Sequence, residues 1–271
     1  MRTWTRVALA ACLVMGLAGA QAQVLQETAS GSVDWQSRII RAKGIGIPSE
    51  KGGRAGQIRV ARMDALRKIL ETVEGMALTS ETTVQEYVLE NDRIQTEVRG
   101  ICRNFREVGD PVYLSDGSIE LTVEMNLGAD LQNALLGGQD FQDGTPVPVQ
   151  YSDMDPGAIY TGLVVDCKGL GLRPALAPRI LDESGSEVYG SAWVDRDWAL
   201  QNGMVGYVKS VEQARQNQDR VGAKPLLVKA KAVQGSQKAD MVIADRDGKV
   251  LHALGENLKF LSECRVLVVV D

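Results

Sequence analysis

The chain has 271 residues, a formal net charge of −5 and a single histidine, His252. Hydrophobic residues make up 44% of the chain and charged residues 24%, which predicts a globular protein with a core and excludes disorder throughout. One histidine excludes metal sites that need two imidazoles, and the acidic balance argues against a general nucleic-acid binder.

Residues 1–22 have the pattern of a secretory signal peptide. Two arginines accompany an apolar segment at residues 7–17, which is too short to cross a hydrocarbon core of about 30 Å. Ala20-Gln21-Ala22 matches the small-x-small pattern of a cleavage site, so we expect the mature chain to begin at Gln23. No later segment is apolar enough to predict a transmembrane helix.

The segment Leu9-Ala10-Ala11-Cys12 resembles a lipobox, in which Cys12 would be acylated. Only five residues separate Arg6 from Cys12, whereas the apolar segment of a signal peptide usually has about 7–15 residues. We therefore expect a soluble exported protein, with an acylated Cys12 as the alternative.

The first half of the mature chain predicts a helix packed on a sheet. Residues 23–32 are small and polar and predict a frayed terminus. Residues 35–45 are rich in β-branched side chains and predict a strand, and the glycine-rich residues 44–56 predict a loop. Apolar residues recur at steps of three or four over residues 58–76, which predicts a long helix.

Residues 81–89 alternate between apolar and polar and predict a strand, whereas residues 92–100 fit a helix or a strand. Residues 101–108 and 118–127 predict an antiparallel pair, because turn signals lie between them. The predicted fold class is α+β, with a long helix packed on an antiparallel sheet in the order β-α-β-β over residues 33–136.

A second, mixed α/β domain is predicted at residues 158–271. The segment before it, residues 137–157, holds four glycines, three prolines and four aspartates and predicts a linker. The second domain contains a hairpin signature at Asp182-Glu183-Ser184-Gly185 and a helix N-terminus at Ser210. Its last elements follow the order strand, helix, strand, which suggests a parallel pair joined by a crossover.

Arg54, Arg59 and Arg62 concentrate positive charge on the long predicted helix. They are candidate contacts for an anion or an acidic partner, and a solvated helix face is the alternative. Gly44-Ile45-Gly46 before that helix suggests a phosphate loop, but neither a complete G-x-G-x-x-G nor a complete Walker A motif follows. We therefore favour a structural role for these glycines.

No complete catalytic or metal-binding motif is present, so we expect a non-enzymatic protein without a cofactor or a metal. The two Asp-Arg-Asp segments lack the spacing of a calcium loop. A hydrolase with paired carboxylates in the second domain is a further hypothesis. The aromatic-rich stretch around Trp193 and Trp198 predicts either a binding surface or burial in the second core.

The mature chain holds three cysteines, Cys102, Cys167 and Cys264, an odd number for an oxidising compartment. Cys167 ends one predicted strand and Cys264 immediately precedes another. If these strands are antiparallel neighbours, the two cysteines come close enough for a disulfide, whereas parallel strands would forbid it. The alternative is three buried thiols, and Cys102 is expected to stay free.

A family resemblance appears in a series of short segments of the first domain: Ala42-Lys43-Gly44-Ile45-Gly46, Ala61, Ala65-Leu66, Gly75, Thr82-Thr83-Val84 and Asp116-Gly117. This pattern resembles the LPP-type small outer-membrane lipoprotein family and the N-terminal domain of flagellar assembly protein T. The resemblance implies a helix-on-sheet structural module of the periplasm or outer membrane, and it carries no catalytic residues. The position of Cys12 departs from the lipoprotein members.

These observations lead to one functional hypothesis and one alternative. We expect an exported, periplasmic cell-envelope protein, a structural or assembly module associated with the outer membrane or the flagellar motor, which acts on protein partners or on itself. The alternative is a periplasmic binding module for an anionic glycan or peptide, using Arg54, Arg59 and Arg62.

Overall fold

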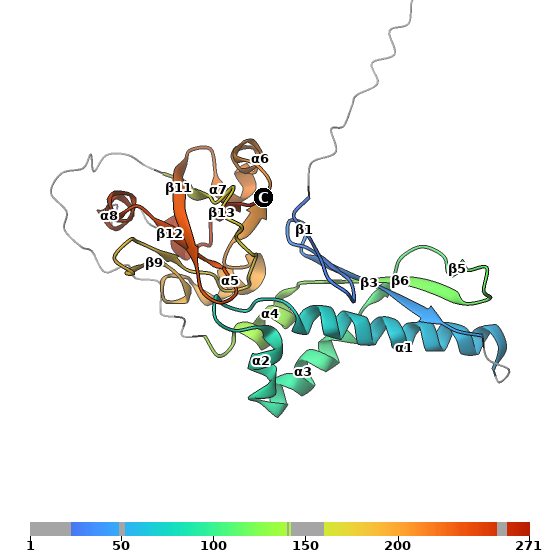
Figure 1. Cartoon of the computed structure of the whole chain (residues 1–271). Coiled ribbons are helices and arrows are strands. Elements are labelled where there is room, and N and C mark those ends of the chain that lie inside the picture. Colours follow the sequence, from blue (N-terminus) through green and yellow to red (C-terminus); the bar gives the residue numbers. More distant parts are fainter. Residues whose placement is uncertain (1–22, 49–51, 140, 142–159, 254–258) are drawn as a thin grey trace, which may run out of the picture.

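The computed structural model describes residues 23–48, 52–139, 141, 160–253 and 259–271. The predicted signal peptide with Cys12, and most of the predicted linker, lie outside the described residues. The chain folds into two units, each built on its own sheet (Figure 1). Within the described part, every helix is too short or too polar to span a bilayer.

The first unit has a six-stranded sheet in the order β1-β2-β3-β6-β4, with β5 also paired to β6, and every pair is antiparallel. Its strands are β1 (Leu25–Glu27), β2 (Ser32–Asp34), β3 (Ile39–Gly46), β4 (Arg106–Glu107), β5 (Val112–Tyr113) and β6 (Ile119–Asn126). The sheet thus begins before residue 33, and the prediction of a frayed terminus is wrong. Val24, Val33 and Trp35 are buried, and they hold the β1–β2 hairpin in place.

Helix α1 (Gly53–Glu74) lies along one face of this sheet, as the apolar periodicity predicts (Figure 1). Ala61, Ala65 and Ile69 are fully buried on its sheet side. Gly44 lies in β3 rather than in the predicted loop, and a Cβ placed there would be 2.0 Å from the Ala61 carbonyl oxygen. The Gly44-Ile45-Gly46 motif therefore permits close contact between helix and sheet, which is its structural role.

Three shorter helices complete the first unit: α2 (Val84–Leu89), α3 (Asp92–Cys102) and α4 (Ala129–Leu136). The predicted strand at residues 81–89 is wrong, because Thr83 and Glu86 form a capping box at the start of α2. The backbone N–H groups of Thr83 and Glu86 both donate hydrogen bonds in this capping box. These bonds favour the helix over the strand that the alternating pattern predicts.

The second unit is a mixed α/β domain with a seven-stranded sheet in the order β10-β13-β7-β11-β12-β8-β9. Its strands are β7 (Gly162–Asp166), β8 (Ile180–Leu181), β9 (Glu187–Tyr189), β10 (Gly206–Val208), β11 (Pro225–Gln234), β12 (Asp240–Ile243) and β13 (Val266–Val269). Its helices are the 3₁₀ turn η1 (Ser191–Trp193), α5 (Arg196–Asn202), α6 (Val211–Gln216), α7 (Gln218–Val221), α8 (Asp245–Ala253) and α9 (Lys259–Ser262). The predicted hairpin is confirmed as the antiparallel pair of β8 and β9.

Two expectations about strand neighbours are wrong. The last two strands, β12 and β13, are not paired with each other; β13 lies between β7 and β10 and is parallel to both. Cys167 follows the end of β7 and Cys264 precedes the start of β13. Because these two strands are parallel, the two cysteines lie at opposite ends of the pair. The length of a five-residue strand, about 16 Å, separates these positions, and both thiols are free. The structure therefore has the parallel arrangement that forbids a Cys167–Cys264 disulfide, and Cys102, Cys167 and Cys264 are the buried free thiols of the alternative.

The two units pack against each other through a continuous hydrophobic core. Trp35 of the first unit meets Tyr207 of the second in an edge-to-face contact, with 5.5 Å between the ring centroids. The backbone N–H of Ala177 donates to the Leu78 carbonyl oxygen at 2.7 Å across the same boundary. Cleavage in the predicted linker is therefore expected to leave the two units associated.

A buried carboxylate also joins the units. Asp240 in β12 is 1% exposed and accepts hydrogen bonds from the Ser80 hydroxyl at 2.7 Å and from the Arg179 guanidinium at 2.6 Å. Ser80 belongs to the loop before α2, so this contact ties the first unit to the second sheet. The first sheet projects away from this boundary (Figure 1).

Candidate interaction surface

Helix α1 covers one face of the first sheet and leaves the other face open to solvent. Successive residues of a strand point to opposite faces, and the buried positions of β3 and β6 face the helix. The opposite positions form the open face: Arg41, Lys43 and Ile45 of β3, with Glu120, Thr122 and Glu124 of β6. Directly paired residues share a face. Arg106 of β4, which pairs with Glu124, and Val112 of β5, which pairs with Glu120, therefore belong to the open face as well.

The end of the open face near the β1–β2 hairpin is charged and internally paired. Glu124 is only 4% exposed and lies between Arg41, at 3.0 Å, and Arg106. Lys43 pairs with Glu120 at 3.0 Å. These ion pairs satisfy the charges of this end without any ligand.

The other end of the open face carries apolar side chains on both sides of Glu120. Ile45 pairs through Glu120 with Val112, which places all three side chains in one row. Ile45 is 39% exposed and Val112 is 51% exposed. Val108, which is also exposed, directly follows β4, the strand that pairs with β6 at Val123 and Glu124. We name this surface the tip surface and define it by these residues and the two exposed apolar residues beside them: Ile45, Ile47, Val108, Val112 and Leu114.

Exposed apolar side chains are concentrated at this end of the protein. Of the twelve exposed large hydrophobic residues in the described part, eight lie on β3 or directly after it, on the first half of α1 or in the β4–β6 connection. They comprise the tip surface with Val60, Met63 and Tyr113. This end of the sheet points away from the second unit (Figure 1), so the described residues of that unit do not cover it. Concentrated apolar exposure of this kind is typical of an interaction site.

The three arginines predicted as contacts do not form a cluster. Arg54 stacks over the Tyr113 ring, 4.5 Å from its centroid. Arg62 donates a hydrogen bond to the Glu107 carboxylate, and this bond raises the pKa of Arg62. Arg59 is exposed, and about 140° of helix surface separates it from Arg54. The structure therefore places Arg54 over Tyr113, on the side of the sheet that faces α1, and pairs the charge of Arg62 with that of Glu107.

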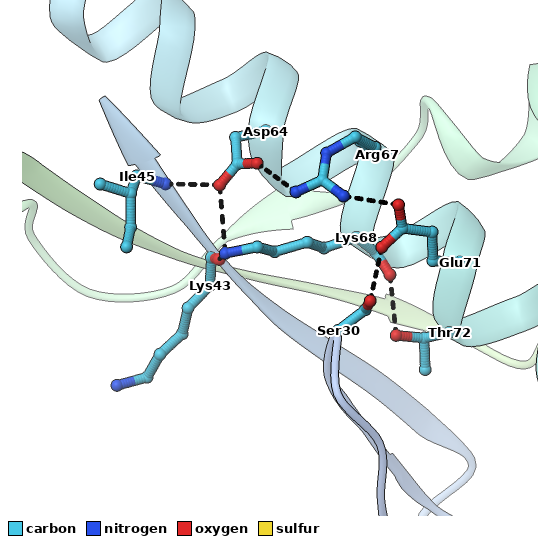
Figure 2. Close-up of polar contacts among 8 residues, drawn as sticks. All are labelled: Ser30, Lys43, Ile45, Asp64, Arg67, Lys68, Glu71 and Thr72. Atoms are coloured by element: carbon cyan, nitrogen blue, oxygen red, sulfur yellow. Dashed lines mark hydrogen bonds and ion pairs between the residues drawn. The ribbon is translucent and has the colours of Figure 1, made fainter. Parts of the chain in front are cut away.

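The free edge of β3 is closed by side chains of α1, as Figure 2 shows. Beyond Arg41 no strand among the described residues pairs with this edge, and its backbone groups would be open to pairing with another chain. Asp64 accepts a hydrogen bond from the Ile45 backbone N–H at 2.9 Å, and Lys68 donates to the Lys43 carbonyl oxygen at 2.7 Å. These bonds disfavour strand addition, and they leave the open face as the accessible part of the sheet.

Asp64 is itself held by a network of cations (Figure 2). Partial burial raises the pKa of Asp64, but hydrogen bonds from Arg67, the Ile45 backbone and Lys68 together lower it below its ordinary value. The Asp64–Lys68 distance is 3.1 Å, which is the i, i+4 pair expected on a helix. Asp64 therefore stays ionised at neutral pH.

A groove of about 400 Å³ lies beside this edge, between the β1–β2 turn and Lys68. Arg41, Lys43 and Lys68 line it, but each cation already has a protein partner. Among the described residues, no group of three or more histidine, cysteine or acidic side chains gathers in a way that would hold a metal ion. The groove therefore gives no separate evidence for a ligand.

The tip surface is a candidate interaction surface that sequence reasoning missed. The signal in the sequence was the type of residue at the solvent-facing positions of the strands. A strand with one solvated face normally carries polar residues at these positions, as β3 does at Arg41 and Lys43. Ile45 and Val112 break that pattern. The pairing that brings them into one row depends on sheet register, which the sequence alone does not supply.

A family model described as Treponema pallidum Tp0624, second domain, matches residues 162–271. The match begins at the first residue of β7 and covers the second unit, which is less than half of the chain. No curated protein matches the chain.

Proposed function

We propose that this protein is an exported, non-enzymatic component of the cell envelope that works as an assembly module, associated with the outer membrane or the flagellar motor. The signal-peptide pattern and the resemblance of the first domain to LPP-type and flagellar assembly modules support export and an envelope role. The tip surface supports an assembly role, and it is the observation that carries the proposal.

The composition of the tip surface fits a protein partner. Protein interfaces combine an apolar centre with aromatic residues and arginine. Here five aliphatic side chains form the tip surface, and the stacked pair of Arg54 and Tyr113 lies at the same end of the sheet, on the side that faces α1. Because the edge of β3 is closed by Asp64 and Lys68, we infer that assembly uses the open face rather than strand addition.

The alternative, a binding module for an anionic glycan or peptide, needs Arg54, Arg59 and Arg62 to act on one ligand. Arg62 is already paired with Glu107, and the helix separates the other two. The observations therefore favour assembly. A second copy of the chain is the partner that is tested first.

Light scattering of the purified mature chain tests the proposal. We expect particles larger than a monomer whose size increases with protein concentration, and we expect Val112→Glu to shift them toward the monomer. Leu227→Glu is the matched control, since Leu227 is 44% exposed but lies on β11 of the second unit.

Two results would contradict the proposal of self-assembly through the tip. One is a monomer at all concentrations whose binding to an anionic glycan weakens with salt, which favours the binding module. The other is assembly that Val112→Glu and Leu227→Glu change equally, which would place the contact elsewhere.

A further inference from the structure

A cavity of about 370 Å³ lies in the second unit, between α5, the junction of α6 and α7, and the turn before β13. Small-molecule sites typically have volumes of about 300–1,000 Å³. Trp198 of α5 lines this cavity and is 41% exposed. Trp193, from the same aromatic stretch, packs against the core instead. Packing therefore accounts for Trp193 and does not account for the exposed ring of Trp198.

Polar groups with unused hydrogen-bonding capacity line the same cavity as Trp198. Within the part of the chain that the structure describes, the Asn202 carboxamide makes no hydrogen bond and the Asp219 carboxylate has no ion pair. The side-chain carboxamide oxygen of Asn217 accepts a hydrogen bond from the Arg220 backbone N–H at 3.3 Å. The two N–H donors of this carboxamide remain available. The cavity thus combines hydrogen-bond donors and acceptors with one aromatic side chain.

The charges that line the cavity balance. Arg220 donates to the carbonyl oxygens of Asn202 at 2.7 Å, Gly203 at 2.8 Å and Val266 at 3.0 Å. These bonds use three of its five N–H donors. Two arginines and two acids line the cavity, and one pair of them, Arg265 and Glu263, is bonded at 2.8 Å. This balance favours neither an anion nor a cation.

We propose that this cavity binds a neutral saccharide of one or two rings. The C–H groups on one face of a sugar ring pack against an indole face, because the ring surface of tryptophan is apolar and carries negative charge density. Sugar hydroxyls both donate and accept hydrogen bonds, and they match the carboxamides of Asn202 and Asn217 and the carboxylate of Asp219. The inference goes beyond assembly and does not depend on it, since the tip surface belongs to the other unit.

Ligand-observed NMR of the full mature chain with N,N′-diacetylchitobiose, cellobiose and maltose tests this inference. We expect saturable binding of at least one disaccharide, with a Kd of about 1 mM. Trp198→Ala is expected to weaken it about tenfold, Trp198→Phe less, and Asp219→Asn and Asn202→Ala also to weaken it. Leu227→Ala, an exposed apolar residue of the same unit outside the cavity, is expected to leave binding unchanged.

Failure to bind any of the three disaccharides at about 10 mM would overturn the inference. Binding that Trp198→Ala leaves unchanged would also overturn it, because the sugar would then lie elsewhere. Circular dichroism establishes that each variant is folded, and if Trp198→Ala does not fold, the Asp219 and Asn202 variants decide the outcome. Light-scattering results on the tip surface do not affect this test.

Discussion

Replacing Gly44 by alanine tests the close packing of α1 on the first sheet. The added Cβ would lie 2.0 Å from the Ala61 carbonyl oxygen, 2.5 Å from the Ala65 backbone nitrogen and 2.7 Å from the Ala65 Cβ. Two of these atoms belong to the helix backbone, so no side-chain rotation relieves the contact. The helix must move away from the sheet by more than 1 Å to restore ordinary contact distances.

We expect Gly44→Ala to lower the free energy of unfolding by about 2–3 kcal/mol, toward the upper end for overpacked cores. The smaller conformational entropy of unfolded alanine offsets part of the strain. For a chain of this size the midpoint of thermal unfolding would fall by about 4–10 °C. Urea unfolding followed by circular dichroism measures the change.

Gly100→Ala is the matched control, because it makes the same chemical change without a clash. Gly100 lies in α3, is exposed, and has no atom within 4 Å of an added Cβ. Alanine is the better helix former, so we expect a gain of about 0.5–1 kcal/mol. If Gly44→Ala were as stable as the original chain, the account of the glycine motif would be refuted.

Three further predictions concern buried and charged groups. Burial raises the pKa of the Cys102, Cys167 and Cys264 thiols to about 12, so we expect no alkylation by iodoacetamide at pH 8 until the chain unfolds, and no disulfide-linked peptide in a non-reducing digest. The fold lowers the pKa of Asp64 below its ordinary value of 3.8. The ionised carboxylate therefore stabilises the fold above that pH, and this stabilisation is lost as the pH falls through the pKa of the folded state. In acid unfolding experiments, we expect the free energy of unfolding of Asp64→Asn to depend less steeply on pH. Asp240→Ala leaves the Ser80 hydroxyl across the unit boundary and the Arg179 guanidinium of the same unit without this acceptor. We expect chemical denaturation to show a loss of about 2–4 kcal/mol in the free energy of unfolding.

Elements with strong local signals were predictable from the sequence. The apolar periodicity of α1 identified the residues that contact the sheet, since helix burial follows a fixed spacing along the chain. The β8–β9 hairpin followed from its turn residues, which determine a local chain reversal. In both cases the physical cause lies within a few neighbouring residues.

Features that depend on distant residues were not predictable in the same way. The position of β13 between β7 and β10 depends on long-range pairing, and with it the separation of Cys167 from Cys264. Trp193 and Trp198 lie five residues apart in one polar-aromatic stretch, yet one packs on the core and the other lines a cavity. Neither residue carries a local signal that distinguishes the two environments.

Hydrogen–deuterium exchange of the mature chain, compared between dilute and assembling concentrations, tests the assembly role most directly. The edge strands β4 and β5 are two residues long and exposed, so their amides and those of the connecting residues exchange readily in the monomer. We predict that assembly slows exchange at residues 106–114 and at the end of β3, and leaves the second unit unchanged. Slower exchange confined to the second unit, or none at any site on assembly, would contradict the claim that the tip surface is the interface.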